Sequence, residues 1–231
     1  MRLLVVDLLA ERKAFGKEGV REIIAHFDNP DVYLWSPHTD ERIEYGYGTV
    51  VSEPVECDYI AITGSRRNVS SWEPWMDEVA NLIRTAEVPI IGICFGHQII
   101  AKALGGVVSK SDKGWGVGIH TYELSEAPFD GAQSGQLKLV VSHQDQVHEL
   151  PPGARNVVSN AHCENAGFVM GDHIFTLQGH PEFIDEYSEA IMSFRYDMIG
   201  ADRVAEGRAS LKQHDHEGAR VAGWMLSFIA S

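Results

Sequence analysis

A cysteine between two glycines is the part of this sequence best suited to covalent chemistry. Cys94 lies in the stretch Pro89–Gln98 (PIIGICFGHQ), where an apolar run leads directly into a helical pattern. A tight strand-to-helix turn of this kind projects a nucleophile above the end of its strand, and the flanking glycines let the backbone turn without a steric clash. The following helix N-terminus favours the thiolate, which is the reactive form of cysteine. Cys94 is therefore the predicted nucleophile.

A cysteine nucleophile needs a base, and the base needs a group that orients it. The apolar run Ile174–Leu177 ends in the sequence Gln-Gly-His-Pro-Glu, which supplies both as His180 and Glu182. A carboxylate two residues after the histidine can hold one ring nitrogen while the other nitrogen faces the thiol. Because His180 lies far from Cys94 in the sequence, only the fold can bring the two side chains together.

The elements that must position these residues alternate between strands and helices in the first half of the chain. Short apolar runs are followed by helically spaced apolar residues around 20–27, 75–83 and 95–104. The predicted strands are Leu3–Val6, Val32–Trp35, Tyr59–Thr63 and Pro89–Ile93. This alternation is typical of a parallel sheet with helices on both faces.

After Gly105 the pattern changes to short strands and turns, which predicts a mixed or antiparallel extension of the sheet. The predicted strands are Gly118–Leu124, Leu137–Ser142, Val157–Asn160, Gly167–Met170 and Ile174–Leu177. Two amphipathic helices follow, one carrying Ile184, Tyr187, Ile191, Phe194 and Met198, the other Val221, Trp224, Met225 and Phe228. With no repeat or Pro/Gly/Ser-rich linker, residues 1–231 are expected to form one α/β domain.

Composition narrows the function class. The chain has 231 residues and is 44% hydrophobic, with 19 basic against 33 acidic residues and a net charge of −14. Such a surface repels phosphate backbones and anionic lipids, so we expect neither nucleic-acid nor membrane binding. Cys57, Cys94 and Cys163 show neither disulfide-framework nor CxxC spacing, and no signal sequence is evident. A reducing, cytoplasmic location is expected.

Several motifs together resemble the class I glutamine amidotransferases over nearly the whole chain. Gly92–Gln98 matches the family's Gly-x-Cys-x-Gly-x-Gln elbow, and His180–Glu182 matches its His-Pro-Glu motif. Thr63–Ser65 resembles the glycine turn of the family's oxyanion hole. Ser142–Val147 and Lys113–Gly118 are similar to segments of the stand-alone members related to GMP synthase. The resemblance implies a flavodoxin-like fold, in which a mostly parallel sheet lies between two layers of helices.

The resemblance also implies a reaction. Cys94 attacks the side-chain amide carbon of glutamine, and backbone N–H groups of Phe95 and the Gly64-Ser65 turn stabilise the oxyanion. His180 protonates the departing ammonia and then activates the water that hydrolyses the thioester. Glu182 orients His180. No cofactor is expected.

Other residues are candidates for substrate binding. By resemblance, Gln98 and the segment at Asp145 and Gln146 hold the α-amino and α-carboxylate groups of the substrate, although Gln98 alone also fits an exposed helix residue. Arg66 and Arg67 follow the oxyanion turn, where relatives usually have small residues or proline. They fit either a substrate carboxylate, held bidentately, or a solvated loop that could contact a partner protein.

No metal site is expected, because nothing fixes His214 and His216 on one face, and a solvated link before the last helix is predicted there. Three functions remain open. The chain is a free-standing hydrolase of γ-glutamyl conjugates, a glutaminase subunit that passes ammonia to a separate synthetase, or a catalytically silent regulatory module. No synthetase domain or phosphate-binding loop is evident in the sequence. The intact set of Cys94, His180 and Glu182 argues against the silent module.

Overall fold

The computed structural model describes residues 1–9, 13–25, 27–39, 44–124, 134–213 and 215–230. Its strands are β1 (Arg2–Val6), β2 (Asp31–Trp35), β3 (Thr49–Val51), β4 (Tyr59–Ile62), β5 (Ile90–Ile93), β6 (Val107–Lys110), β7 (Gly116–Leu124), β8 (Gly135–His143), β9 (Asp145–Glu149), β10 (Arg155–Ser159), β11 (Gly167–Met170) and β12 (Ile174–Leu177). Its helices are α1 (Lys13–Ile24), α2 (Trp75–Thr85), α3 (Phe95–Ala103), α4 (Asp185–Phe194), α5 (Tyr196–Ile199), α6 (Ala201–Gln213) and α7 (Gly218–Ala230).

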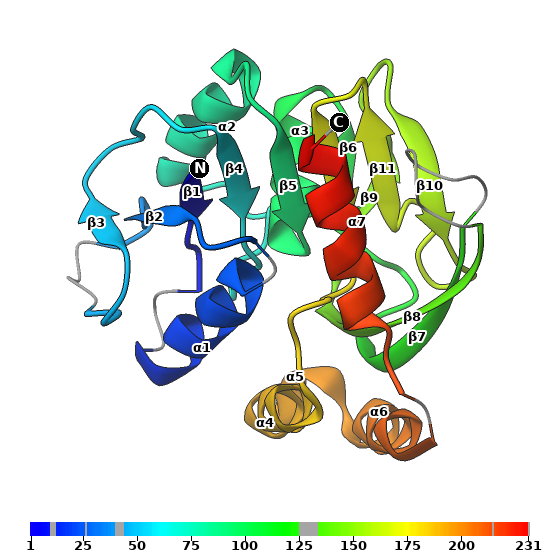
Figure 1. The fold of residues 1–231 in the computed structure, drawn as a ribbon. Helices are drawn as coiled ribbons and strands as arrows, with labels where there is room; N and C mark the ends of the chain where they lie inside the picture. The colour runs from blue at the N-terminus through cyan, green and yellow to red at the C-terminus, as the bar shows by residue number, and fades with distance from the viewer. Residues whose placement is uncertain (10–12, 26, 40–43, 125–133, 214, 231) are drawn as a thin grey trace.

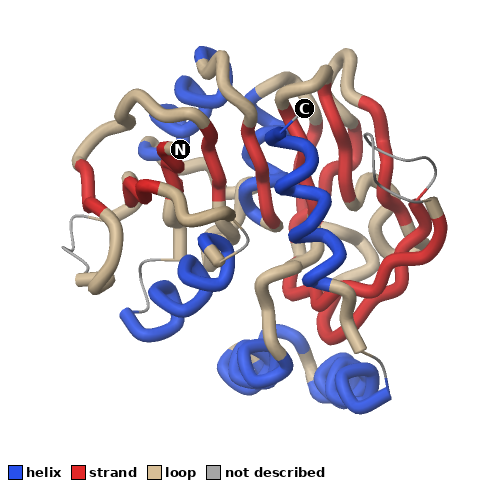
Figure 2. The backbone as a smooth tube through the Cα atoms, viewed as in Figure 1, coloured by secondary structure: helices blue, strands red, loops and turns tan. Residues whose placement is uncertain are grey.

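Ten of the described strands form one sheet in the order β3-β2-β1-β4-β5-β12-β11-β10-β7-β8. The strands from β3 to β12 in this order pair in parallel. The remaining four, β11, β10, β7 and β8, are added antiparallel. Figure 2 shows the strands in red and the helices in blue. The predicted parallel core and its antiparallel extension are confirmed. β6 and β9 form a separate two-stranded ribbon.

Helices cover both faces of the parallel part of the sheet. α1 and α7 lie on the near face in Figure 1, and α2 and α3 lie behind it. Alternate side chains of β1 point to opposite faces, as expected for a strand. Leu3 and Val5 join the core cluster beneath α1 and α7, while Leu4 and Val6 join the cluster beneath α2 and α3. The result is the expected three-layer, flavodoxin-like fold.

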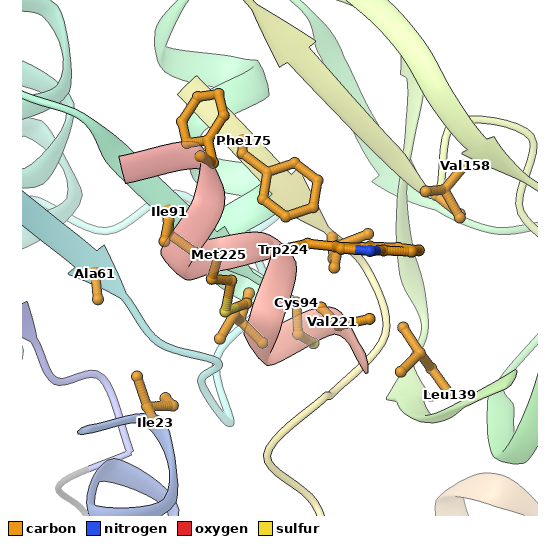
Figure 3. Close-up of a cluster of buried hydrophobic side chains, with 14 of the residues drawn as sticks. Ile23, Ala61, Ile91, Cys94, Leu139, Val158, Phe175, Val221, Trp224 and Met225 are labelled. Atoms are coloured by element: carbon orange, nitrogen blue, oxygen red, sulfur yellow. The ribbon is translucent and has the colours of Figure 1, made fainter. Parts of the chain in front are cut away.

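The core beneath α7 reaches the candidate nucleophile. Figure 3 shows Val221, Trp224 and Met225 of α7 above the sheet, with Phe175 of β12 in the same cluster. Cys94 belongs to this cluster as well. The last helix therefore closes one side of the turn that carries Cys94.

The structure corrects the predicted helix that carried Ile184 to Met198. The segment forms two helices, α4 and α5, which are separated at Arg195. Three residues of the predicted buried stripe are exposed: Ile184 by 40%, Phe194 by 49% and Met198 by 61%. Instead α4 buries Ser188 and Met192. The apolar spacing indicated a helix but not the face that packs.

Some elements were not predicted. α6 occupies the segment before the predicted link and buries only Val204 and Gly207, so it has little apolar periodicity. β3 and the β6–β9 ribbon are short and partly exposed. Within the described residues, no helix combines the length and apolarity that crossing a membrane requires.

Candidate active site

The candidate residues gather at the carboxyl edge of the parallel strands. Because β1, β4, β5 and β12 run in the same direction, the segments that follow them share one edge of the sheet. Asp7 follows β1, Thr63–Ser65 follow β4, Cys94 follows β5, and Gln178–Glu182 follow β12. Ligands of open α/β sheets bind at this edge, beside the point where the strand order reverses. Here the reversal lies between β1 and β4.

The backbone of Cys94 is strained, because the chain turns tightly there from β5 into α3. Its φ is 52° and its ψ is −100°, outside the regions that non-glycine residues usually occupy. A Cβ on Gly92 would come within 2.8 Å of the Gly96 carbonyl carbon, and a Cβ on Gly96 would come within 2.2 Å of the Ile62 oxygen. Glycine is therefore required on both sides of Cys94. The predicted strand–Cys–helix elbow is present in the structure.

His180 and Glu182 form a buried pair beside Cys94. The His180 Nδ1–H donates to Glu182 Oε1 at 2.7 Å, and the two residues are only 3% and 2% exposed. The His180 ring stacks on Phe183 with 3.8 Å between centroids. Burial disfavours the imidazolium, but the negative charges of Glu182 and Cys94 and their hydrogen bonds outweigh it and raise the pKa of His180 to about 10. The direction of this shift favours the protonated form of the histidine.

The turn after β4 fits closely against these residues. A Cβ on Gly64 would lie 3.0 Å from His180 Cε1 and 3.7 Å from Cys94 Cβ, so a side chain there would press on the histidine. The Gly96 N–H donates to the Thr63 carbonyl at 3.1 Å and joins this turn to the elbow. The Thr63 hydroxyl donates to the Gly64 carbonyl and accepts from the Leu8 N–H, each at 2.9 Å. Backbone contacts thus hold the turn beside the nucleophile.

Two pockets adjoin the buried pair. The first, which we call the nucleophile pocket, has a volume of about 260 Å³ with the open solvent at its mouth included, and it is lined by Ser65, Arg67, Asn68, Cys94, Phe95, Gln98, Trp115, Ser142, His143, Gln144, Asp145 and Arg195. The second, which we call the histidine pocket, has a volume of about 480 Å³, again with open solvent included, and it is lined by Leu9, Ser65, Arg66, Ser142, His180, Phe183, Ile191, Phe194 and Arg195. Ser65, Ser142 and Arg195 line both.

Gln98 and Asp145, two of the predicted substrate-binding residues, both line the nucleophile pocket. Gln98 Nε2 donates to the Asp145 carbonyl at 2.8 Å and to Gln178 Oε1 at 3.0 Å, which leaves its own oxygen as the atom available to a ligand. Asp145 Oδ2 accepts from the Ser70 N–H at 2.7 Å. Its other oxygen, Oδ1, is buried and has no hydrogen-bond partner among the described residues. A buried acceptor of this kind suits a substrate ammonium group.

The other three candidates are spread around the site. Gln146 turns away from both pockets and donates to the His162 carbonyl at 3.0 Å. Arg67 lines the nucleophile pocket and pairs with Glu73 at 3.5 Å. Arg66 lines only the histidine pocket. The two adjacent arginines therefore face different pockets.

Sequence reasoning missed two residues. Gln178 is fully buried, and its Nε2 donates to Cys94 Sγ at 3.6 Å while its Oε1 accepts from Gln98. Its place directly after a buried strand and two residues before His180 was the available signal, because a buried polar residue needs a partner. Arg195, at the break between α4 and α5, carried no signal, because only the fold brings it to the pockets.

The remaining cysteines and histidines lie in different surroundings. Burial raises the pKa of Cys163 to about 12 and also raises that of Cys57. The rings of His120 and His143 each make a T-shaped contact with the ring of His162, yet among the described residues no group of three or more His, Cys, Asp or Glu side chains could hold a metal ion. His214 lies outside the described residues, and His216 Nδ1 accepts from the Gly218 N–H at 3.3 Å.

Comparisons with known proteins identify relatives of this chain. Residues 32–196 match the family of class I glutamine amidotransferases. The chain is 33% identical over 179 residues to gamma-glutamyl peptidase 2 of Arabidopsis thaliana, covering 73% of this chain and 71% of that protein. It is 34% identical over 155 residues to the glutamine-hydrolysing GMP synthase of Bordetella parapertussis, covering 62% of this chain but only 29% of that protein.

The fold is also similar to that of solved structures. A crystal structure of a glutamine amidotransferase from Thermotoga maritima superposes with a TM-score of 0.76, covering 99% of this chain and 96% of the other at 22% identity. That similarity shows the fold, and the family match over residues 32–196 shows the membership. This chain belongs to the class I glutamine amidotransferase family.

Proposed function

We propose that this chain hydrolyses γ-glutamyl amides, either glutamine or a γ-glutamyl conjugate, through a thioester on Cys94. The main support is the buried His180–Glu182 pair at 2.7 Å beside a strained cysteine elbow. A protonated histidine held against a cysteine is the arrangement that stabilises a thiolate nucleophile. The similarity to a gamma-glutamyl peptidase and to the amidotransferase part of a GMP synthase supports the same substrate class.

In the first half-reaction, Cys94 Sγ attacks the side-chain carbonyl carbon of the γ-glutamyl group. The N–H groups of Phe95 and of the Gly64-Ser65 turn stabilise the resulting oxyanion. The C–N bond then breaks, its electron pair stays on nitrogen, and the His180 imidazolium gives that nitrogen a proton. Ammonia or an amine leaves, and the γ-glutamyl group remains on sulfur as a thioester.

In the second half-reaction, His180 acts as a base. A thioester carries no negative charge, so acylation removes the thiolate contribution that raises the His180 pKa, while burial continues to lower it. The histidine becomes better suited to accept a proton from water. Water attacks the thioester carbon, the C–S bond breaks, and glutamate leaves while the thiolate is restored. Glu182 keeps the ring oriented throughout.

Substrate orientation is assigned to the nucleophile pocket. The unpartnered Asp145 Oδ1 and the available Gln98 oxygen suit the substrate α-ammonium group. Arg67 and Arg195 line the same pocket and suit the α-carboxylate. The side chain of Gln146 is too engaged with His162 for a direct role, so we assign it to holding the segment.

We further propose that residues 1–231 form one domain that acts in a reducing compartment such as the cytoplasm. One ten-stranded sheet joins both halves of the chain, and all three cysteines are free thiols. A second candidate function is a glutaminase subunit that delivers ammonia to a separate synthetase. The chain aligns with only 29% of a GMP synthase, and the similarity is to its amidotransferase part. This supports the second function, because that part works together with a synthetase part.

Steady-state turnover by the purified chain alone tests the proposal. Wild-type protein, Cys94→Ala and His180→Ala are assayed with glutamine and with γ-glutamyl peptides, and released glutamate is measured. We expect turnover by the wild type, its loss in each variant, and little further loss in the double variant, because members of one relay are not additive. Activity on glutamine that appears only when a synthetase is added would assign the chain to the subunit role instead.

A further inference from the structure

We infer that the histidine pocket binds the leaving amine, and that it selects γ-glutamyl amides in which this amine is a hydrophobic α-amino acid. The inference rests on the proposed function, because it assigns a subsite to the same reaction. It goes further by naming the part of the substrate beyond the glutamyl group.

The position of the pocket follows from the reaction. The leaving nitrogen must take its proton from His180, so the group attached to that nitrogen lies on the His180 side of the reacting carbon. His180 lines the histidine pocket, whereas Cys94, Gln98 and Asp145 line the nucleophile pocket. The two pockets meet at Ser65 and Ser142, which line both. One pocket can thus hold the glutamyl group while the other holds the amine.

The lining of the pocket is too apolar to serve ammonia. Leu9, Phe183, Ile191 and Phe194 come from the loop after β1, the loop before α4 and α4 itself. Phe194 is 49% exposed, so an apolar group of a ligand that covered its ring would be stabilised by the burial. The leaving group of glutamine has no carbon atoms to fill this space. An amine with an apolar side chain does.

Arg66 at the pocket indicates a carboxylate on the same amine. The Arg66 guanidinium lies 4.7 Å from the centre of the Phe194 ring. Arg195 donates from Nη2 to the Arg66 carbonyl at 3.4 Å and lies 5.1 Å from the centre of the Trp115 ring. Among the described lining residues there is no carboxylate to pair with Arg66. An α-amino acid supplies an amine, an apolar side chain and a carboxylate in one group.

The chemistry needs no further reactant. The C–N bond to the amino acid breaks as the C–S bond to Cys94 forms, and the amino-acid nitrogen receives its proton from His180. Water then releases glutamate. The products are glutamate and a free hydrophobic amino acid.

Four substrates separate the two features of the leaving group. γ-Glutamyl-phenylalanine carries both the apolar group and the carboxylate, γ-glutamyl-phenethylamide only the apolar group, γ-glutamyl-glycine only the carboxylate, and glutamine neither. With the purified full chain, we expect kcat/KM to be highest for γ-glutamyl-phenylalanine, by about 100-fold over glutamine, since an apolar group in a pocket gives 10- to 200-fold discrimination.

Variants then assign each feature to a residue. Arg66→Gln should lower kcat/KM about tenfold for the two carboxylated substrates and leave the other two unchanged. Phe194→Ala should lower it several-fold for the two phenyl substrates only. Arg155→Gln on β10 and Met198→Ala on α5 are exposed residues outside both pockets and serve as matched controls.

The outcomes are distinguishable. Cys94-dependent turnover with no preference among leaving groups, or an Arg66→Gln loss that is equal for all four substrates, overturns the pocket assignment and leaves the proposed function standing. If wild-type protein cleaves none of the four, both proposals are wrong. The predicted pattern across substrates and variants supports both.

Discussion

Two polar neighbours of His180 raise its pKa, whereas its burial lowers it. Burial alone would keep the imidazole neutral, but Glu182 and Cys94 raise its pKa to about 10. Glu182 Oε2 is buried without a hydrogen-bond partner among the described residues, so this carboxylate interacts mainly through the oxygen that faces His180. The single pair therefore sets both the orientation and the protonation of the ring.

Replacing Glu182 by glutamine should separate orientation from charge. Glu182→Gln can still accept the Nδ1–H bond but removes the negative charge, so the His180 pKa falls and kcat drops by about 10⁴-fold, as in the Ser-His-Asp triad. The measurements are kcat and an NMR titration of the His180 ring. Glu186→Gln, an exposed acid in the first turn of α4, is the control. Full activity in Glu182→Gln would mean that another residue positions the histidine.

Gln178 provides a second test at this scale. Gln178→Leu keeps the approximate size but removes the donor to Cys94 Sγ and the acceptor for Gln98. Gln178→Glu keeps the acceptor and places a negative charge beside the sulfur. We expect alkylation of Cys94 by iodoacetamide at fixed pH to slow by about tenfold in both, since each loses one hydrogen bond to a charged group. KM should rise mainly in Gln178→Leu. Unchanged alkylation rates in both variants would rule out this positioning role.

Among the elements, the elbow depends on close packing of α3 against the end of β4. A Cβ on Gly96 would lie 2.2 Å from the Ile62 oxygen, and backbone there cannot move without moving the strand. Gly96→Ala should therefore destabilise the protein by about 3 kcal/mol or more. Urea unfolding measures the change.

Gly223→Ala in α7 is the matched control for this substitution. Gly223 is also a helical glycine, but a Cβ there meets no atom within 4 Å. The same change should stabilise the protein by about 0.5–1 kcal/mol, because glycine is a poor helix former. Similar stability of the two alanine variants would show that the turn tolerates a side chain.

Asp7, which lies directly after β1, should make the stability of the protein depend on pH. Asp7 is fully buried, accepts from the Tyr45 hydroxyl and from the Leu9 N–H, and has its pKa raised to about 6 by burial. A carboxyl whose folded pKa is raised stabilises the protein when it is protonated. That stability is complete below the unfolded pKa of 3.8 and is lost as the pH rises through about 6.

Asp7→Asn removes this dependence. Relative to the variant, the wild type should lose about 3 kcal/mol of unfolding free energy between about pH 3 and pH 7, measured by urea unfolding at each pH. Asp58→Asn is a control with the opposite sign, because the Arg2 backbone N–H lowers the Asp58 pKa. A difference between wild type and Asp7→Asn that stays constant with pH would show that Asp7 is not protonated in the folded protein.

How far the sequence predicts the structure depends on which elements bury apolar side chains. β1, β4 and β5 are almost fully buried, so their apolar runs predicted them well. α6 lies on the surface with two buried residues, and its composition resembles a polar link. In the same way, Cys94, His180 and Glu182 carry local motifs, whereas Arg195 reaches the site only through tertiary packing.

At the scale of the whole molecule, the site is assembled by both halves of the chain. The parallel half carries Cys94 and the Gly64 turn, while the His180 N–H donates to Val140 of β8 at 2.8 Å and so joins the site to the antiparallel half. α4 adds the apolar wall of the histidine pocket. The chain has a net charge of −14, but Arg66, Arg67 and Arg195 line the two pockets of the candidate site. Three positive side chains therefore lie together at this site on an otherwise acidic protein.

The central claim is that Cys94 carries the γ-glutamyl group during turnover, and trapping that intermediate tests it most directly. Wild-type protein is mixed with γ-glutamyl-phenylalanine, quenched in acid within milliseconds, digested and mapped by mass spectrometry. The account predicts a γ-glutamyl adduct on the Cys94 peptide, none on the buried Cys163 or on Cys57, and no adduct or turnover in Cys94→Ala. Release of glutamate at an undiminished rate by Cys94→Ala, or an adduct on another residue, would contradict it.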